Sequence, residues 1–139
     1  MYAGTTEGCC DIIGATKSGL EVLSGTLAKI LEKNPGSKVS IVAYAGTNVY
    51  RGNGRPRKTR WVAKKPRGWD TPAASARMLR EAEGFFREKN IDTSRIGKIY
   101  AGYKDSARVE LWFIPAGDKA PKPDPAYRIG KPPKTKDIL

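Results

Sequence analysis

Residues 69–116 constrain the fold most, because a helix pattern, a turn and two strand patterns follow one another there. Thr71 and Pro72 mark the helix start. Threonine is a favoured N-cap residue, and proline in the first helical position gives up only an N–H group that would stay unpaired. Behind them, Met78 and Phe85 lie two helical turns apart with further apolar residues between, opposite a charged face. The pattern predicts an amphipathic helix that buries one face.

Two strand patterns come after this helix. Residues 92–94 supply turn chemistry, and an extended run begins at Ile96. Residues 104–106 have the composition of a hairpin turn. Beyond them, apolar and polar side chains alternate through residues 109–113, which is typical of a strand buried on one face. The patterns therefore predict a helix followed by two strands with a hairpin turn between them.

A second helix and strand are predicted upstream. Apolar residues recur at helical spacing over residues 20–31, and Asn-Pro-Gly at 34–36 ends the pattern. Residues 39–45 predict a buried strand, and the short apolar run at 9–13 predicts another. The order strand, helix, strand, helix, strand, strand indicates an α/β (α+β) sandwich: one mixed sheet with both helices packed on one face.

The length of 139 residues with 39% hydrophobic content suits a single core. We expect the domain to cover residues 1–116. The remaining residues, 117–139, hold five prolines and mostly lysine charges, so they predict an extended tail that lies on another surface or stays mobile. No apolar run is long enough for a membrane span, and residues 1–11 lack the pattern of a signal peptide. We expect a cytoplasmic protein if Met1 is the native start, and an envelope protein if a leader was removed.

The strongest charge feature is a basic flap at residues 49–69. Between residues 51 and 68 it carries eight basic side chains and no acidic one, out of a formal net charge of +12. Its glycines and prolines predict a long loop, and it lacks the Gly-Lys-Ser/Thr ending of a phosphate-binding loop. The candidate partner-binding residues are Arg51, Arg55, Arg57, Lys58, Arg60, Trp61, Lys64, Lys65 and Arg67 in the flap, and Lys122, Tyr127, Arg128 and Lys131 in the tail.

Three interpretations of the flap stay open. Arginines can pair with carboxylates or phosphates, so the flap could bind protein subunits with an acidic surface or anionic lipid headgroups, with Trp61 as the anchor. Clustered Arg and Lys around an aromatic residue also fit nucleic acid. The third interpretation is a solvated loop. Few aromatic stacking platforms are expected elsewhere, which favours protein over single-stranded nucleic acid.

Catalysis is not expected. The chain has no histidine, which removes the commonest general base, and its carboxylates fit helix faces or turns. Cys9 and Cys10 are adjacent, so a disulfide between them would be strained; free thiols are expected, although a disulfide to another molecule stays open. Two cysteines without histidine do not favour a metal site. We expect no catalytic residues, no metal and no cofactor.

The segment WDTPAASARMLREAEGFFREKNIDTSRIGKIYAGYKDSARVELWFIPAG resembles the second half of the OmpA C-terminal-like (peptidoglycan-associated) domain family. The earlier DIIGATKSGLEVLSGTLAKIL and VSIVAYAGTN are similar to the family's opening strand and helix and to the strand before its Gly-x-Thr-Asp turn. About residues 9–116 are covered. The resemblance implies the same sandwich fold and a place in the periplasm or at the outer face of a bacterial membrane.

The resemblance also implies two ligand-site positions. Family members hold the diaminopimelate group of peptidoglycan between an aspartate in that turn and an arginine early in the second helix. Arg77 matches the arginine, with Met78 as the alternative, and Asn48 stands where the aspartate is expected. A neutral amide cannot make the charge-assisted bond to an ammonium group. We therefore expect at most weak peptidoglycan binding, and an accessory, protein-binding role in a larger assembly.

Overall fold

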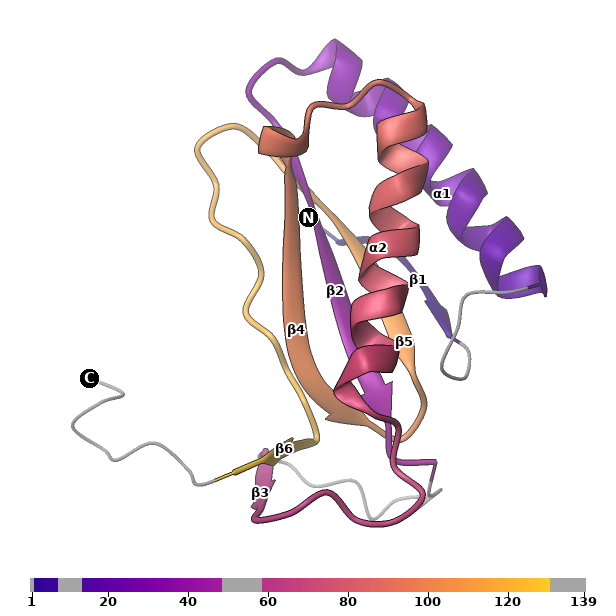
Figure 1. Cartoon of the computed structure of the whole chain (residues 1–139). Helices are drawn as coiled ribbons and strands as arrows, with labels where there is room; N and C mark the ends of the chain where they lie inside the picture. Colours follow the sequence, from indigo (N-terminus) through magenta and orange to yellow (C-terminus); the bar gives the residue numbers. More distant parts are fainter. Residues whose placement is uncertain (1, 8–13, 49–58, 131–139) are drawn as a thin grey trace.

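The computed structural model describes residues 2–7, 14–48 and 59–130. In chain order its elements are β1 (Tyr2–Glu7), α1 (Gly14–Lys33), β2 (Lys38–Gly46), β3 (Arg60–Val62), α2 (Pro72–Glu88), the 3-10 turn η2 (Thr93–Arg95), β4 (Ile96–Lys104), β5 (Arg108–Ile114) and β6 (Tyr127–Ile129). Both helices lie on the same side of the sheet (Figure 1). The predicted α/β sandwich is confirmed. The predicted strand at residues 9–13 lies outside the described residues, and the observed first strand is β1.

The six strands form one mixed sheet in the order β1-β5-β2-β4-β6-β3. β2 runs parallel to β4 and antiparallel to β5, and β1 pairs antiparallel with β5 at the edge. At the other edge, β6 pairs antiparallel with β4 and parallel with β3. The sheet is therefore extended on the β4 side by two short strands that the sequence patterns did not predict.

The main core lies between the sheet and the two helices. Leu20, Leu27 and Leu31 of α1 and Met78 and Phe86 of α2 are almost fully buried, and they pack with the inward side chains of β2 and β5. Burial of these apolar faces is what stabilises helices of this length. Neither helix in the described part of the chain has the length and apolar content of a membrane span.

Helix α2 begins where the sequence predicts, at Pro72 after an extended Thr71. The Thr71 side chain makes no capping hydrogen bond; its backbone carbonyl accepts the bond from the Ala74 N–H (3.0 Å). The turn after the helix also follows the prediction, since the Asp92 carboxylate accepts a hydrogen bond from the Ser94 N–H (2.8 Å). That bond lowers the pKa of Asp92.

The face of the sheet opposite the helices has a core of its own. Val42, Tyr44 and Ala101 are buried there. Asp124 of the tail lies next to them, since its backbone N–H donates a hydrogen bond to the Tyr44 hydroxyl (3.0 Å). As far as Gly130 the tail is thus part of the domain, which differs from the predicted separate tail. The proline pattern contains no signal for the surface on which the tail packs.

A buried carboxylate also lies on this second face. Glu110 is 6% exposed. Its Oε2 atom accepts from Arg108 Nε (2.7 Å) and lies 3.9 Å from Lys104 Nζ, and its Oε1 atom accepts from Trp112 Nε1 (3.0 Å). Lys104 also lies over the Tyr44 ring, 4.4 Å from its centre. These bonds compensate the burial of the charge.

Two buried tyrosines make the free energy of unfolding decrease at alkaline pH. Burial raises the pKa of the Tyr44 and Tyr103 hydroxyls above the ordinary value of 10.0. The folded state holds these protons more tightly than the unfolded chain does. The contribution of the two tyrosines to the free energy of unfolding is therefore complete below pH 10 and is lost as the pH rises through the folded pKa.

We expect Tyr44→Phe to make the free energy of unfolding fall less steeply above pH 10, as measured by urea denaturation. Tyr100→Phe, at an exposed position, serves as the control; an unchanged slope in Tyr44→Phe would contradict the assignment.

Candidate functional site

The basic flap and the tail meet in the structure. β3 and β6 pair in parallel, with Arg60 opposite Tyr127 and Trp61 opposite Arg128. Outside this ladder, the Thr59 hydroxyl donates to the Pro125 carbonyl (2.7 Å). The two segments are far apart in the sequence, yet they form one end of the sheet (Figure 1).

This pairing creates a cationic surface with an aromatic component. The guanidinium of Arg128 lies over the Trp61 ring, 5.9 Å from its centre, within the range of a cation–π contact. Arg60 is exposed next to Trp61 in the chain, on the opposite face of β3, and Lys64 and Arg67 are exposed in the loop that follows β3. We name these five residues, Arg60, Trp61, Lys64, Arg67 and Arg128, the basic edge.

Other predicted partner-binding residues are placed differently. Lys65 is exposed, but its Nζ atom donates to the Trp69 carbonyl (3.1 Å) and so fastens the loop. Lys122 is exposed on the tail. Arg51, Arg55, Arg57, Lys58 and Lys131 lie outside the described residues, as do Cys9 and Cys10.

Tyr127 corrects one prediction. It was expected to extend the contacts along a partner, but it is only 5% exposed and belongs to a second apolar cluster. The Trp69 ring lies 5.2 Å from the Tyr127 ring and 4.9 Å from the Tyr103 ring, centre to centre. Aromatic contacts of this kind hold β6, and with it the basic edge, on the sheet.

Asp70 links β2 to the start of α2. It is 7% exposed, and its Oδ2 atom accepts from the Gly46 N–H (2.9 Å). Its backbone pairs with Gly46 in return, and its carbonyl accepts from the Tyr103 hydroxyl (2.7 Å). A side chain at position 46 would not fit into this arrangement. An added Cβ on Gly46 would lie 2.7 Å from the Ala107 nitrogen and 2.9 Å from Asp70 Oδ2. No local sequence pattern indicates this role.

The two family ligand positions are not arranged as a free clamp. The Asn48 amide nitrogen donates to Asp70 Oδ1 (2.9 Å) and to the Gly68 carbonyl (3.0 Å), so its donors serve the protein itself. Asn48 has a positive φ of 61°, which asparagine tolerates. Arg77 is exposed on α2, whereas Met78, the alternative match, is 2% exposed in the core. The Met78 position therefore presents no group to a ligand.

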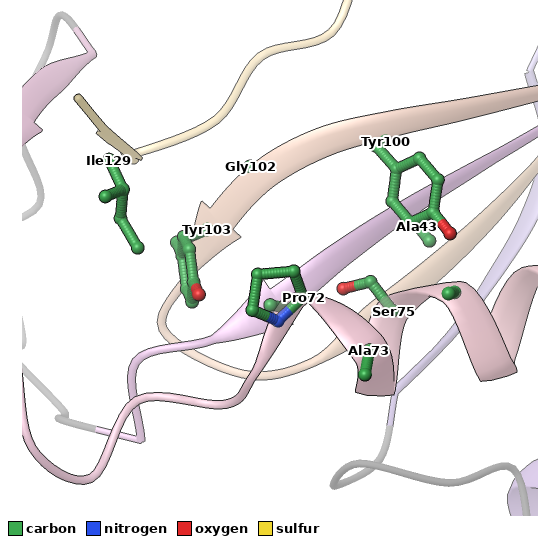
Figure 2. Close-up of a pocket in the computed structure, with 10 residues that line it drawn as sticks. Ala43, Pro72, Ala73, Ser75, Tyr100, Gly102, Tyr103 and Ile129 are labelled. Carbon is green, nitrogen blue, oxygen red and sulfur yellow. The ribbon is translucent and has the colours of Figure 1, made fainter. Parts of the chain in front are cut away.

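A pocket of about 470 Å³ lies next to the basic edge, between the first turns of α2 and strand β4 (Figure 2). It is lined by Ala43, Ala45, Pro72, Ala73, Ser75, Ala76, Tyr100, Gly102, Tyr103 and Ile129. The lining contains no charged side chain. Sequence reasoning missed it, because the run of small residues in α2 matters only once β4 and β6 are placed opposite it.

No group of three or more potential metal-ligating residues occurs in the parts of the chain that the structure covers. The chain matches no protein-family model and no curated protein. The resemblance to the OmpA C-terminal-like family accordingly stays a prediction.

Proposed function

We propose that this protein is a non-enzymatic interaction domain, an accessory subunit of a larger assembly, which binds an acidic protein surface through the basic edge. The observation that supports this most is the parallel pairing of β3 with β6, which brings cations from the flap and the tail together. The proposed setting, peripheral to a membrane in the bacterial envelope, rests on the family resemblance alone.

The chemistry of the basic edge favours an acidic protein. Arginine makes planar two-point contacts with carboxylates, and arginine and tryptophan are the residues most enriched at interface hot spots. Trp61 is half-buried under Arg128, so this pair is already ordered before a partner arrives. Ordering before binding reduces the entropy cost of association. The formal net charge of +12 would also speed the encounter with an acidic partner.

Nucleic acid remains the competing ligand. Among residues 19–48 and 59–130, whose side chains the structure describes, Tyr100 is the only aromatic side chain in the exposed class, and Trp61 is half-buried. Single-strand binders use several stacking platforms, so this surface favours protein over single-stranded nucleic acid. Peptidoglycan is disfavoured because the Asn48 amide is already engaged.

The proposal is tested by reversing charge on the basic edge. In Arg60→Glu/Arg128→Glu, the net charge falls by four and the contact over Trp61 is lost. We expect recovery of the partner from a native membrane extract to fall by at least about ten-fold, since hot-spot arginines typically contribute 2 kcal/mol or more. Lys29→Glu/Lys33→Glu makes the same charge change at exposed positions of α1 and should bind normally.

A photo-reactive phenylalanine analogue at position 61 identifies the class of partner. We expect cross-links to a protein that survive nuclease treatment, and none from the same analogue at the exposed position 22. Nuclease-sensitive cross-links, or equal partner recovery by both charge-reversal variants, would refute binding of an acidic protein by the basic edge.

A further inference from the structure

The pocket beside the basic edge has the chemistry of a socket for an apolar group. Its volume of about 470 Å³ falls in the usual range of ligand sites, about 300–1,000 Å³. Four alanines and Pro72 form much of the wall, and two tyrosines frame it on the β4 side. Figure 2 labels Pro72, Tyr100 and Tyr103 among these residues, and it shows the Ser75 hydroxyl on the side of Pro72.

Ser75 is a polar group that this pocket leaves available. The residue is 3% exposed, and its side chain lines the pocket. Its hydroxyl is not one of the buried polar atoms without a partner that the described residues contain, so it reaches the space of the pocket and can bond a backbone group of a ligand there.

Strand β4 offers a backbone edge at the same place. On its outer side β6 pairs with it only at Tyr103 and also approaches Gly102, so over residues 96–101 the described strands provide no neighbour on that side. Gly97, Lys98 and Tyr100 are exposed along this stretch, with Tyr100 at 56%. An unpaired strand edge can accept an extended peptide as an additional strand.

The charge around the pocket defines the peptide further. Ile129 of β6 lines the pocket, and its neighbour Arg128 belongs to the basic edge. Arg128 faces away from the pocket, because Ile129, the next residue of β6, faces into it. An added Cβ on Gly102 would lie 3.3 Å from Arg128 Cγ, so the arginine stem lies beside β4 at Gly102. The first turn of α2 lies on another side, and the positive end of its dipole also favours acidic groups.

We propose that the pocket and the β4 edge together bind an extended acidic segment of the partner protein, which inserts one aromatic side chain into the pocket. The segment would add as a strand along this edge, so the residues next to the inserted aromatic one would face the opposite side of the sheet and place their carboxylates on the side of Arg128. This inference rests on the proposed function and specifies the partner's sequence chemistry: an aromatic residue flanked by aspartate or glutamate.

The test uses fluorescence anisotropy with a labelled nine-residue peptide, in which phenylalanine is flanked on each side by four acidic residues. A second peptide carries alanine in the central position. We expect the phenylalanine peptide to bind the full chain at least about ten-fold more tightly, because burial of the ring supplies that much affinity. Ala76→Phe, which fills the pocket from a half-buried position, should remove the advantage. Val22→Phe adds the same ring at a 69% exposed site and should not.

Amide hydrogen exchange gives a second measurement. Bound peptide should slow exchange of amides within residues 96–101, which pocket filling alone would not do. Equal affinity for the two peptides, unchanged binding by Ala76→Phe, or no binding of either peptide would overturn the inference. If both peptides bind equally and only Arg60→Glu/Arg128→Glu loses them, the basic edge functions without the pocket, and the proposed function stands alone.

Discussion

Asp70→Ala is expected to lower the free energy of unfolding by about 3–5 kcal/mol. The carboxylate is buried and accepts two hydrogen bonds, from the Gly46 N–H and the Asn48 amide. Hydrogen bonds to charged groups contribute about 1.5–3 kcal/mol each. Without the carboxylate, the Gly46 N–H also loses its acceptor. Urea denaturation followed by far-UV circular dichroism measures the change.

Asp118→Ala is the matched control for this variant. Asp118 is exposed in the turn after β5, so its substitution should change stability by less than about 0.5 kcal/mol. Asp70→Asn keeps the shape and an oxygen acceptor, and it should fall between the wild type and Asp70→Ala. A loss below about 1 kcal/mol in Asp70→Ala would mean that the loop does not depend on the carboxylate.

Gly102→Ala is the second prediction with a large effect. Gly102 has a φ of +103°, and an added Cβ would lie 2.9 Å from both Pro125 Cβ and the Tyr127 carbonyl oxygen. The strained backbone and the clash should together cost about 2–4 kcal/mol. Relief is available if the tail leaves β4, so we expect faster amide exchange over residues 125–130 and a weaker basic edge.

Gly97→Ala tests whether the effect is specific to this position. Gly97 lies on the same strand, but an added Cβ would meet its nearest atom, Ser40 Oγ, at 3.6 Å, which is an ordinary contact. It should leave exchange in β6 unchanged. If Gly102→Ala also leaves the tail protected and partner binding intact, β6 is not held by this close approach.

The sequence predicted those elements whose signal is local. Helix α2 has a start signal at Pro72 and an apolar face at helical spacing, and β4 and β5 have strand patterns with a turn between them; these elements were found. The predicted hairpin was wrong, because β2 lies between β4 and β5 in the sheet and pairs with both of them. Helix α1 begins at Gly14, earlier than the predicted residue 20, because the small and polar residues at 14–19 carry no apolar periodicity.

The remaining features depend on contacts between distant segments. β6 lies in a proline-rich stretch, and its burial comes from Trp69 and Tyr103, which no local pattern connects to Tyr127. Asp70 likewise gains its role from Gly46, 24 positions earlier. The predicted cations of the candidate site were identified by composition, whereas the neighbouring pocket arises only from the packing of α2 against β4.

The β3–β6 pairing also bears on the order of events during folding. The two strands are separated by more than sixty positions and enclose α2, β4 and β5 between them in the sequence. Closing a loop of that length before its interior is ordered is entropically unfavourable, so short-range pairs should form first. A nascent chain would thus complete its scaffold early and become competent for association only after its last strand had docked.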